Sequence, residues 1–288
     1  MSQIICFGEV LWDLLPTGKK LGGAPLNVTF RLTEFKQDAL LVSAIGTDDL
    51  GEQIKTQISH LGINATLKRH SQLRTGVVLV DLQPDGSAKY TIEHPVAWDE
   101  IPTKLLKSNV VVFGSLALRS EYNKSELNTL ITKANLVFFD VNLRAPFFSF
   151  ELIEAYICKS DLIKFNNEEF EWYCTMNDWD ADLDTAITAF QQKFPNKSLC
   201  ITLGAAGAIW LVSGEVYKAS APKIKVQDTI GAGDAFFACL ITGIQLQKSH
   251  QEILEFACKV GAIVATQKGA TTALTTTIIG EFNKIKSL

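Results

Sequence analysis

The segment Asp228-Thr229-Ile230-Gly231-Ala232-Gly233-Asp234 places two glycines and a carboxylate directly before an apolar helix predicted over residues 235–245. Glycines at a helix start allow positive φ, so several backbone N–H groups can face one point, where the helix dipole also attracts an anion. The turn Gly231-Ala232-Gly233 is therefore a predicted phosphate cradle. An acidic residue in the first turn would repel that anion, and Asp234 is explained if it accepts a proton from a hydroxyl.

A structural interpretation of this turn stays open, because Asp234 could simply complement the positive end of the helix dipole. Other phosphate-binding motifs are excluded by spacing. The chain has no G-x-x-x-x-G-K-[ST], no H-R-D and no D-F-G, and Gly233 is not followed by the third glycine of G-x-G-x-x-G. A P-loop enzyme and a protein kinase are thereby excluded, and a nicotinamide dehydrogenase is disfavoured.

The elements that must carry this turn alternate between strand and helix. Short apolar runs predict strands at residues 3–8, 39–44, 110–114, 136–140, 161–165 and 199–203. Helical periodicity predicts helices at 24–35, 50–61, 121–134, 150–160 and 181–194. Strands that are apolar on both faces and separated by helices indicate an α/β fold, a doubly wound, mainly parallel sheet between helices.

Two segments, 75–82 and 87–92, lean instead toward period-two alternation and are joined by the turn signal Gln83-Pro84-Asp85-Gly86. They predict a β-hairpin that projects from the main sheet as a small lid. A second hairpin, 208–212 with 216–219, is predicted at the edge of the sheet. We expect one domain over residues 1–288, with the lid formed from about 9–22 and 73–98.

Polar residues and glycines follow six of the predicted strands at their carboxyl ends. They are Glu9 and Asp13, Gly46, Ser115, Asn142 and Arg144, Asn166 and Glu169, and Gly204. Ligands of open parallel sheets bind in the crevice beyond these ends. The pattern therefore favours one shared crevice.

Composition excludes several other classes. The chain has 288 residues, 47% of them hydrophobic, so it can bury a large core. Its net charge is -4 and no Lys/Arg run is longer than a pair such as Lys19-Lys20, so nucleic acid is not an expected partner. Neither the six cysteines nor the four histidines show metal-ligand spacing. No apolar stretch approaches the roughly 20 residues of a membrane span, and no signal peptide is evident, so we expect a cytoplasmic protein.

Together with Gly22-Gly23-Ala24-Pro25-Leu26-Asn27, the turn at 228–234 resembles the signature motifs of the ribokinase (PfkB) family of carbohydrate kinases, over nearly the whole chain. The family's other motifs follow in order: Gly46-Thr47-Asp48, Thr75-Gly76, Asp140-Val141-Asn142-Leu143-Arg144, Asn166-Asn167-Glu168-Glu169 and Thr202-Leu203-Gly204. Within the family, Gly8-Glu9-Val10-Leu11-Trp12-Asp13 and Pro95-Val96-Ala97-Trp98-Asp99 are most similar to fructokinases.

This resemblance implies a ribokinase-like fold and an ATP-dependent kinase that acts on a primary hydroxyl of a small sugar, most closely fructose giving fructose 6-phosphate. It also implies Mg²⁺ on the phosphates, an activating monovalent cation such as K⁺, and a homodimer formed through the lid hairpins. Asp234 would be the base, and Gly231, Ala232 and Gly233 would form the anion hole for the migrating phosphoryl group.

The remaining roles are carried over by position. Asp13, Gly23 and Asn27 would hold sugar hydroxyls, with Trp98 as a platform and Arg144 as a phosphate clamp. Asn166 would lie at the nucleotide, and Glu169 would hold Mg²⁺ through water. Thr202, Gly204 and Gly207 would line the nucleotide site, and Asp228 would contact the monovalent cation.

Several of these residues have structural alternatives. Asn166 and Glu169 also match a helix capping box, and Asp13 and Asn27 could be turn or cap residues. Arg144 could pair with Asp140 or lie in a surface loop instead. Trp98 could equally be a core aromatic at the base of the hairpin.

Alternatives to a fructokinase remain as well. Another kinase of the same fold would act on 2-keto-3-deoxygluconate, ribose or a nucleoside. A non-catalytic sugar or nucleotide sensor on the same fold would bind these ligands without turnover, although the retained Asp234, cradle glycines and Glu169 disfavour it.

Overall fold

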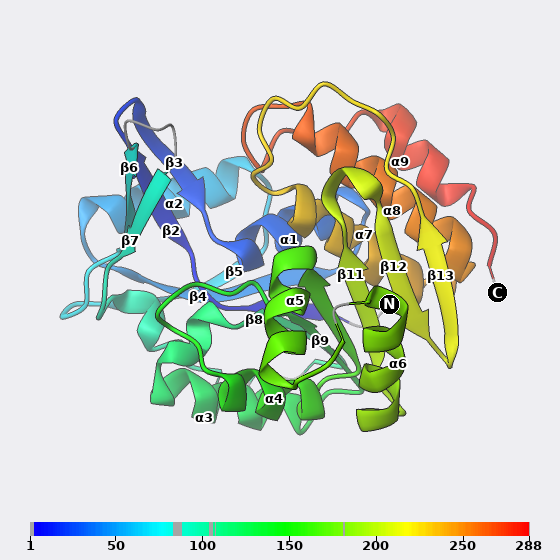
Figure 1. Ribbon diagram of the computed structural model, residues 1–288. Helices are drawn as coiled ribbons and strands as arrows, with labels where there is room; N and C mark the ends of the chain where they lie inside the picture. Colours follow the sequence, from blue (N-terminus) through cyan, green and yellow to red (C-terminus); the bar gives the residue numbers. More distant parts are fainter. Residues whose placement is uncertain (1–2, 83–87, 104–105, 107, 181, 288) are drawn as a thin grey trace.

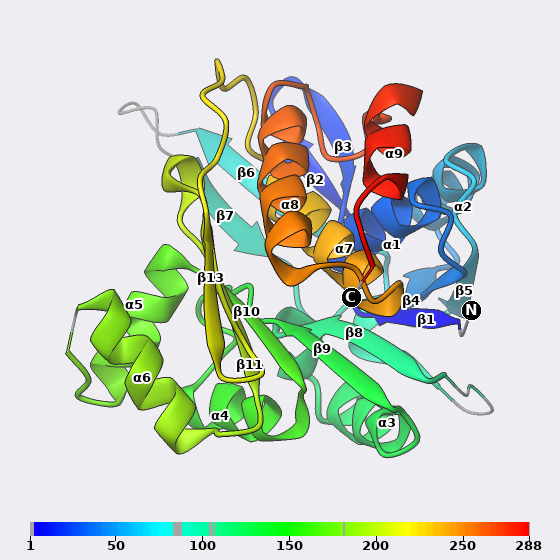
Figure 2. The same ribbon diagram turned by 90° about the vertical axis from the view of Figure 1, so that its right-hand side faces the viewer.

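The computed structural model describes residues 3–82, 88–103, 106, 108–180 and 182–287. In these ranges the main sheet has nine strands in the order β13-β12-β11-β10-β9-β8-β1-β4-β5 (Figures 1 and 2). The strands are β1 (Ile4–Phe7), β4 (Ala39–Gly46), β5 (Ala65–His70), β8 (Val110–Gly114), β9 (Leu136–Asp140), β10 (Leu162–Asn166), β11 (Ser198–Thr202), β12 (Ala208–Val212) and β13 (Glu215–Ala219). All pairs from β11 to β5 are parallel, and β12 and β13 are antiparallel at one edge. The predicted doubly wound, mainly parallel sheet is confirmed.

The central strands are buried along their whole length, which explains their continuous apolar sequences. The strands β1 and β8 read IICF and VVVFG, and every residue of both is buried. In register, Ile4 lies opposite Val110 on one side and Ala39 on the other. A strand covered on both faces has no polar side to present, so the sequence lacks period-two alternation.

Helices cover both faces of the main sheet (Figure 2). One layer contains α1 (Ala24–Glu34), α2 (Asp49–His60), α7 (Ala232–Gln245), α8 (His250–Ala265) and α9 (Thr276–Asn283). The opposite layer contains α3 (Glu121–Ile131), α4 (Phe150–Lys159), α5 (Asn167–Met176) and α6 (Leu183–Lys193). Each layer packs its own apolar cluster against the sheet. In the described ranges, no helix combines the length and the hydropathy required to cross a bilayer.

The helix α7 is the most enclosed of those that carry predicted site residues. Every residue from 235 to 243 is buried, and the helix packs between α1 and α8. A helix that is apolar on all sides can only lie inside its layer. Its first turn, which carries Gly233 and Asp234, is therefore held at a fixed position beside the sheet.

A second sheet, which we call the lid sheet, lies beside the carboxyl ends of the main strands (Figure 1). Its order is β3-β2-β6-β7, with β2 (Leu11–Leu15), β3 (Gly18–Gly22), β6 (Gly76–Leu82) and β7 (Ala88–Ile92). The β6 and β7 strands form the predicted hairpin, and its turn at 83–87 lies outside the described residues. Asp13 belongs to β2 of the lid sheet and not to a loop after β1.

Candidate active site

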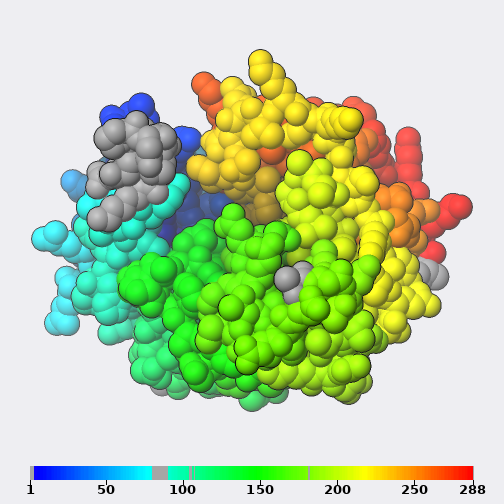
Figure 3. All heavy atoms as spheres, viewed as in Figure 1, coloured from blue at the N-terminus to red at the C-terminus, as the bar shows by residue number. Residues whose placement is uncertain are grey.

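The lid sheet, the start of α7 and the carboxyl ends of the central strands surround a hollow in the molecular surface. Figure 3 shows this hollow between the blue and cyan segments of the lid on one side and the gold and green segments on the other. The crevice that the strand-end pattern predicts lies on this side of the sheet.

The turn before α7 has the geometry of an anion-binding helix start. Gly231 is the N-cap, with φ of 80° in the left-handed region, and its carbonyl accepts the Ala235 N–H at 2.9 Å. A Cβ on Gly231 would lie 2.4 Å from the Cβ of Ala270, so the C-terminal segment closes tightly over this turn. Gly233 is exposed, and the first N–H groups of α7 have no intrahelical acceptor. This end of the helix can therefore receive a phosphate oxygen.

Asp234 is oriented by a residue from the other end of the chain. The Asn27 side-chain amide, in α1, donates a hydrogen bond of 2.8 Å to Oδ2 of Asp234. The Asn27 Oδ1 atom is buried, and no hydrogen-bond partner for it is found in the described residues. Asn27 can therefore bond the carboxylate with its amide and still accept a bond from a ligand hydroxyl.

The position of α1 depends on Gly23. This residue is the N-cap of α1, with φ of 120°, and a Cβ there would lie 2.4 Å from the Glu9 carbonyl oxygen. Only glycine combines that dihedral angle with so close an approach. The proline at the second helical position suits a helix start, where no backbone N–H is needed. The Gly22-Gly23-Ala24-Pro25 motif thus brings Asn27 to the crevice.

The pKa of Asp234 is raised from 3.8 to about 6, mainly because burial penalises its charged form. The Asp140 carboxylate also raises this pKa, whereas the Asn27 hydrogen bond and the charges of Lys164 and Arg144 lower it. A carboxyl group with a pKa of this size is ionised at neutral pH and can still accept a proton. This is the property that a general base requires.

Glu9 is a second carboxyl group with a raised pKa at the same place. The sequence predicts only that it follows β1. It is buried, its Oε1 accepts the Ala24 N–H at 3.2 Å, and Oε2 has no partner among the described residues. Burial raises the pKa of Glu9 to about 7. The charge of Arg144 lowers this pKa, and the charge of Asp234 raises it. Glu9 therefore links the first turn of α1, through the Ala24 N–H, to the charged groups Arg144 and Asp234 at the crevice.

Asp13 and Arg144 face the same region from opposite elements. Asp13 is half-buried and packs against Gly22, where a Cβ would lie 2.5 Å from its Oδ2. Burial raises the pKa of Asp13, and the charges of Arg144 and Lys20 oppose that rise. Arg144 is exposed, and the only hydrogen bond of its side chain within the described residues goes to the Leu143 carbonyl. Its guanidinium is thus available to an incoming anion.

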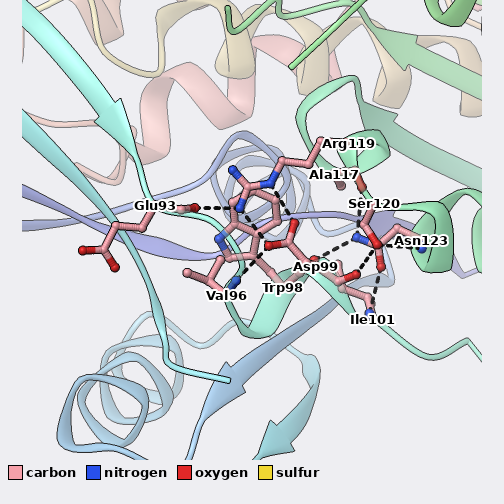
Figure 4. A network of polar contacts seen from close by, with 9 residues as sticks. All are labelled: Glu93, Val96, Trp98, Asp99, Ile101, Ala117, Arg119, Ser120 and Asn123. Carbon is pink, nitrogen blue, oxygen red and sulfur yellow. Dashed lines mark hydrogen bonds and ion pairs between the residues drawn. The ribbon is translucent and has the colours of Figure 1, made fainter. Parts of the chain in front are cut away.

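Trp98 does not line the crevice, and here the structure corrects the sugar-platform interpretation. Its side chain is fully buried, the guanidinium of Arg119 lies 3.8 Å from the ring centroid, and a Cβ on Gly76 would lie 2.1 Å from Nε1. Arg119 also bonds both oxygens of Asp99, at 2.7 and 2.9 Å (Figure 4). With one ring face covered by Arg119 and the indole edge against Gly76, no surface is left for a sugar. The core alternative is the correct one.

Asn166 and Glu169 form the capping box of α5. The Asn166 side chain accepts the Glu169 N–H at 2.9 Å, and Glu169 Oε2 accepts the Asn166 N–H at 2.8 Å. Glu169 Oε1 accepts a further N–H, from Leu143, at 2.9 Å. Each carboxylate oxygen keeps one lone pair, so this arrangement does not prevent Glu169 from accepting a metal-bound water.

The described residues fit Mg²⁺ only if substrate phosphates and a protein carboxylate bind the ion together. Among the described residues no group of three or more His, Cys, Asp or Glu side chains is arranged to hold a metal. Mg²⁺ commonly keeps several waters and is bound by substrate phosphates with one or two carboxylates. A single buried carboxylate, Glu169, at the crevice is the donor that this mode needs.

The predicted nucleotide residues follow β11. Thr202 is the last residue of that strand. Gly204 begins the short 3₁₀ turn Gly204–Ala206 with φ of 57°, and Gly207 follows it with φ of 109°. A Cβ on Gly207 would lie 1.9 Å from the Ala219 carbonyl oxygen, so this position is closed to any side chain. Gly204 is open, with nothing within 4 Å of a Cβ. The turn can therefore approach a flat ligand closely at Gly204.

Asp228 connects three segments in front of the cradle. Its Oδ1 accepts the Ile230 N–H at 3.0 Å, and its Oδ2 accepts the Gly269 N–H at 3.1 Å. The Lys20 ammonium, from the lid sheet, lies 3.4 Å from the same Oδ2. These contacts lower the pKa of Asp228, which is thus a fixed negative charge beside the crevice.

One residue at the site, Lys164, was not singled out from the sequence. Its side chain and that of Asp140 are buried and form an ion pair of 2.7 Å between Nζ and Oδ1. Lys164 sits inside the apolar strand β10, where a lone polar residue has no local signature of function. The Asp140 pairing considered for Arg144 is made by Lys164 instead.

Comparison with known proteins gives a consistent result. A family model described as pfkB family carbohydrate kinase matches residues 3–277. A fructokinase from Solanum tuberosum is 30% identical over 306 residues, covering 95% of this chain and 92% of its own length. A fructokinase from Xylella fastidiosa with bound ATP superposes with a TM-score of 0.85 at 21% identity and covers 97% of both chains. A double mutant of the Vibrio cholerae O395 fructokinase with fructose, ADP and potassium ion bound gives 0.84 at 24% identity, covering 98% of both chains.

Proposed function

Because the chain belongs to the pfkB family of carbohydrate kinases and is an ATP-dependent sugar kinase, we propose that its substrate is fructose and its product fructose 6-phosphate. The curated fructokinases at 28–30% identity over 95% of the chain support this sugar class. The observation that carries the mechanism is the Asn27 amide bonded to the Asp234 carboxylate at the helix start of α7. This contact supports a site in which Asn27 binds a hydroxyl, Asp234 is the base and the turn before α7 binds the anion.

In this proposal the sugar binds under the lid sheet. Asp13 accepts hydrogen bonds from sugar hydroxyls on the lid side, and the free Oδ1 of Asn27 accepts another at the base of the crevice. Gly23 allows the sugar to approach the backbone at the start of α1. Closure of the lid over the sugar excludes water, which would otherwise take the place of the hydroxyl and hydrolyse ATP.

The reaction transfers the terminal phosphoryl group of ATP to the primary hydroxyl of the sugar. The new bond forms between that hydroxyl oxygen and phosphorus, the bond from phosphorus to the bridging oxygen breaks, and ADP leaves. Asp234 accepts the hydroxyl proton late, because the transition state is loose and needs little prior activation of the nucleophile. The amides of Gly231, Ala232 and Gly233 stabilise the charge on the migrating group.

The nucleotide lies across the two glycine turns in this proposal, with Thr202, Gly204 and Gly207 on one side and the cradle on the other. Asn166 lies at the nucleotide and Glu169 holds Mg²⁺ through water, while Arg144 contacts a phosphate. Mg²⁺ bound to the phosphates would neutralise part of their negative charge. Asp228 is the residue that we propose for a monovalent cation such as K⁺, which would compete with the Lys20 ammonium for Oδ2.

The direct test is ADP release measured with fructose, ribose, 2-keto-3-deoxygluconate and adenosine, each with and without potassium. We expect the highest kcat/KM with fructose. A higher kcat/KM with another acceptor would make that acceptor the substrate in place of fructose, and the assignment as a kinase would stand. If sugar or ATP raises the melting temperature and no acceptor is turned over, the result would instead favour a non-catalytic sensor.

Two further properties belong to the same proposal. A homodimer through the lid sheets is supported by β7, an edge strand of that sheet that carries the exposed Tyr90, because an exposed strand edge favours a covering partner. Sedimentation of the protein at several concentrations would show whether it forms. A cytoplasmic location is supported by the six free cysteines, since thiols persist in a reducing compartment.

A further inference from the structure

A buried cation lies under the phosphate cradle, in a position that the mechanism above does not use. The side chain of Lys164, in β10, is 6% exposed, and that of its partner Asp140, in β9, is 7% exposed. The ammonium donates to Asp140 Oδ1 at 2.7 Å. In the described part of the chain this is its one hydrogen bond to protein, so two of its three N–H donors have no protein acceptor.

The ammonium lies directly beside the first turn of α7. A Cβ built on Gly233 would have Lys164 Nζ as its nearest atom, at 3.7 Å. The ring of Phe237, one turn further along α7, has its centroid 5.7 Å from the same nitrogen. Lys164 therefore occupies the space between the central sheet and the turn that carries the predicted anion hole.

Three carboxylates act on this ammonium: Asp140, Glu169 and Asp234, in order of decreasing influence. Their charges keep Lys164 protonated despite its burial, and its pKa is raised. A buried ion pair seldom stabilises a fold compared with apolar residues of the same volume, because removing both charges from water is costly. The pair in the middle of an apolar sheet therefore calls for a functional account.

We infer that Lys164 is a positioning residue for phosphoryl transfer, whose ammonium, anchored on Asp140 beneath Gly233, adds a fixed positive charge to the anion hole at the start of α7. The inference rests on the proposed function, in which the migrating phosphoryl group occupies that anion hole.

The physical reason lies in the charge of the transition state. The migrating group spreads its negative charge over three oxygens, and its stabilisation comes almost entirely from positive groups already in place. Because Asp140 anchors the ammonium, no reorganisation is needed when that charge arrives. Because Asp140 accepts the hydrogen bond of the Lys164 ammonium, the Asp234 carboxylate is left to Asn27 and to the sugar hydroxyl.

The test removes both charges of the pair together, so that no buried carboxylate is left unpaired. We expect Lys164→Met with Asp140→Asn to melt within a few degrees of the wild type and to keep KM for fructose within threefold. The kcat should fall by roughly 10²–10³, the usual scale for losing one preorganised group of an anion hole. A folded double variant with kcat within threefold of the wild type would overturn the inference.

The matched control is the surface pair of Lys124 and Glu121 on α3, which is an ion pair far from the crevice. Lys124→Met with Glu121→Gln should leave kcat and KM unchanged. If that control also loses kcat, the loss does not report on the anion hole, and the inference fails.

A conservative pair of variants covers the case in which the double variant does not fold. Lys164→Arg keeps the charge and Lys164→Gln removes it, at similar side-chain length. We expect kcat of Lys164→Arg to be at least tenfold above that of Lys164→Gln, and equal values would refute the role of the charge. The proposed function is judged separately, by Asp234→Asn and by turnover of fructose in the wild type.

Discussion

The Asn27 amide donates a 2.8 Å hydrogen bond to Oδ2 of Asp234, joining two residues that are 207 positions apart in the sequence. Asn27 lies in the first turns of α1 and Asp234 in the first turn of α7, and each helix begins at a glycine with positive φ. The two glycine-rich motifs therefore do not form separate sites. They place a side-chain amide, a carboxylate and the first backbone N–H groups of α7 against one another.

Replacement of Asn27 should affect both the sugar and the base. In Asn27→Ala the Asp234 carboxylate loses a hydrogen bond that favours its charged form, so the pKa of Asp234 rises further above about 6. The acid limb of the kcat/KM profile should move to higher pH, and kcat/KM for fructose should fall about tenfold or more, because bonds to charged groups contribute about 1.5–3 kcal/mol. Kinetics across the pH range from about 5 to 9 measure both effects.

The charged groups that act on Asp234 are Asp140, Lys164 and Arg144, with Glu9 and Arg31 nearby. Since these are unchanged in Asn27→Ala, a shift of the limb reports on the lost bond. Asn128→Ala, on α3 away from the crevice, is the control. An unshifted limb together with an unchanged KM would mean that the bond does not serve catalysis.

Asp234→Asn should lose activity and gain stability at high pH. We expect kcat to fall by roughly 10²–10⁴, the usual scale for a positioned base, with ATP binding retained. The folded-state pKa of Asp234 is raised to about 6, so its favourable contribution is complete below its ordinary value of 3.8 and is lost as pH rises through about 6. The Tm gain of the variant over wild type should therefore be larger at about pH 8 than at about pH 4.

Asp49→Asn is the control for both measurements, because Asp49 also lies in the first turn of a helix, α2, but is exposed. It should keep full activity. Near-normal turnover of Asp234→Asn would remove Asp234 from the role of base.

The two cradle glycines should respond differently to alanine. Gly231→Ala forces a φ of 80° on a side chain and brings its Cβ to 2.4 Å from Ala270, so we expect a destabilisation of about 2–4 kcal/mol. Gly233→Ala has its nearest contact at 3.7 Å, so the fold should be unaffected. Its methyl group would instead occupy the space of a phosphate oxygen and lower kcat/KM for ATP.

Thermal melting and ATP kinetics separate these two effects. If Gly233→Ala keeps both its Tm and its kcat/KM for ATP, phosphate does not bind at the start of α7. The Lys164 side chain, the nearest group to the new methyl, can serve as an internal check in a structure of the variant.

Trp98 should matter for stability and not for sugar affinity. Trp98→Ala removes a fully buried ring that packs against Arg119, and large-to-small core changes of this kind cost about 3–5 kcal/mol. Trp98→Phe should cost less and leave KM for fructose within twofold of the wild type. Denaturant unfolding and sugar kinetics measure these properties, and a large rise of KM in a folded Trp98→Phe would restore the platform interpretation.

The parallel sheet, the helices on both faces and the lid hairpin could be predicted from sequence, because burial on both faces, helical period and turn signals are local properties of the chain. The turn at Gly231–Gly233 and the capping box of Asn166 and Glu169 could be predicted for the same reason, since the residues that form each lie within four positions of one another.

Only the tertiary structure decided which distant groups meet. Trp98 is equally compatible with a core and with a binding surface until Gly76 and Arg119 are seen to cover it. Lys164 looks like an isolated polar residue in an apolar strand until the parallel pairing of β9 and β10 places it opposite Asp140. Whether a charge or a ring contacts ligand, partner or core depends on the packing of elements that are far apart in the chain, and no local pattern encodes those distances.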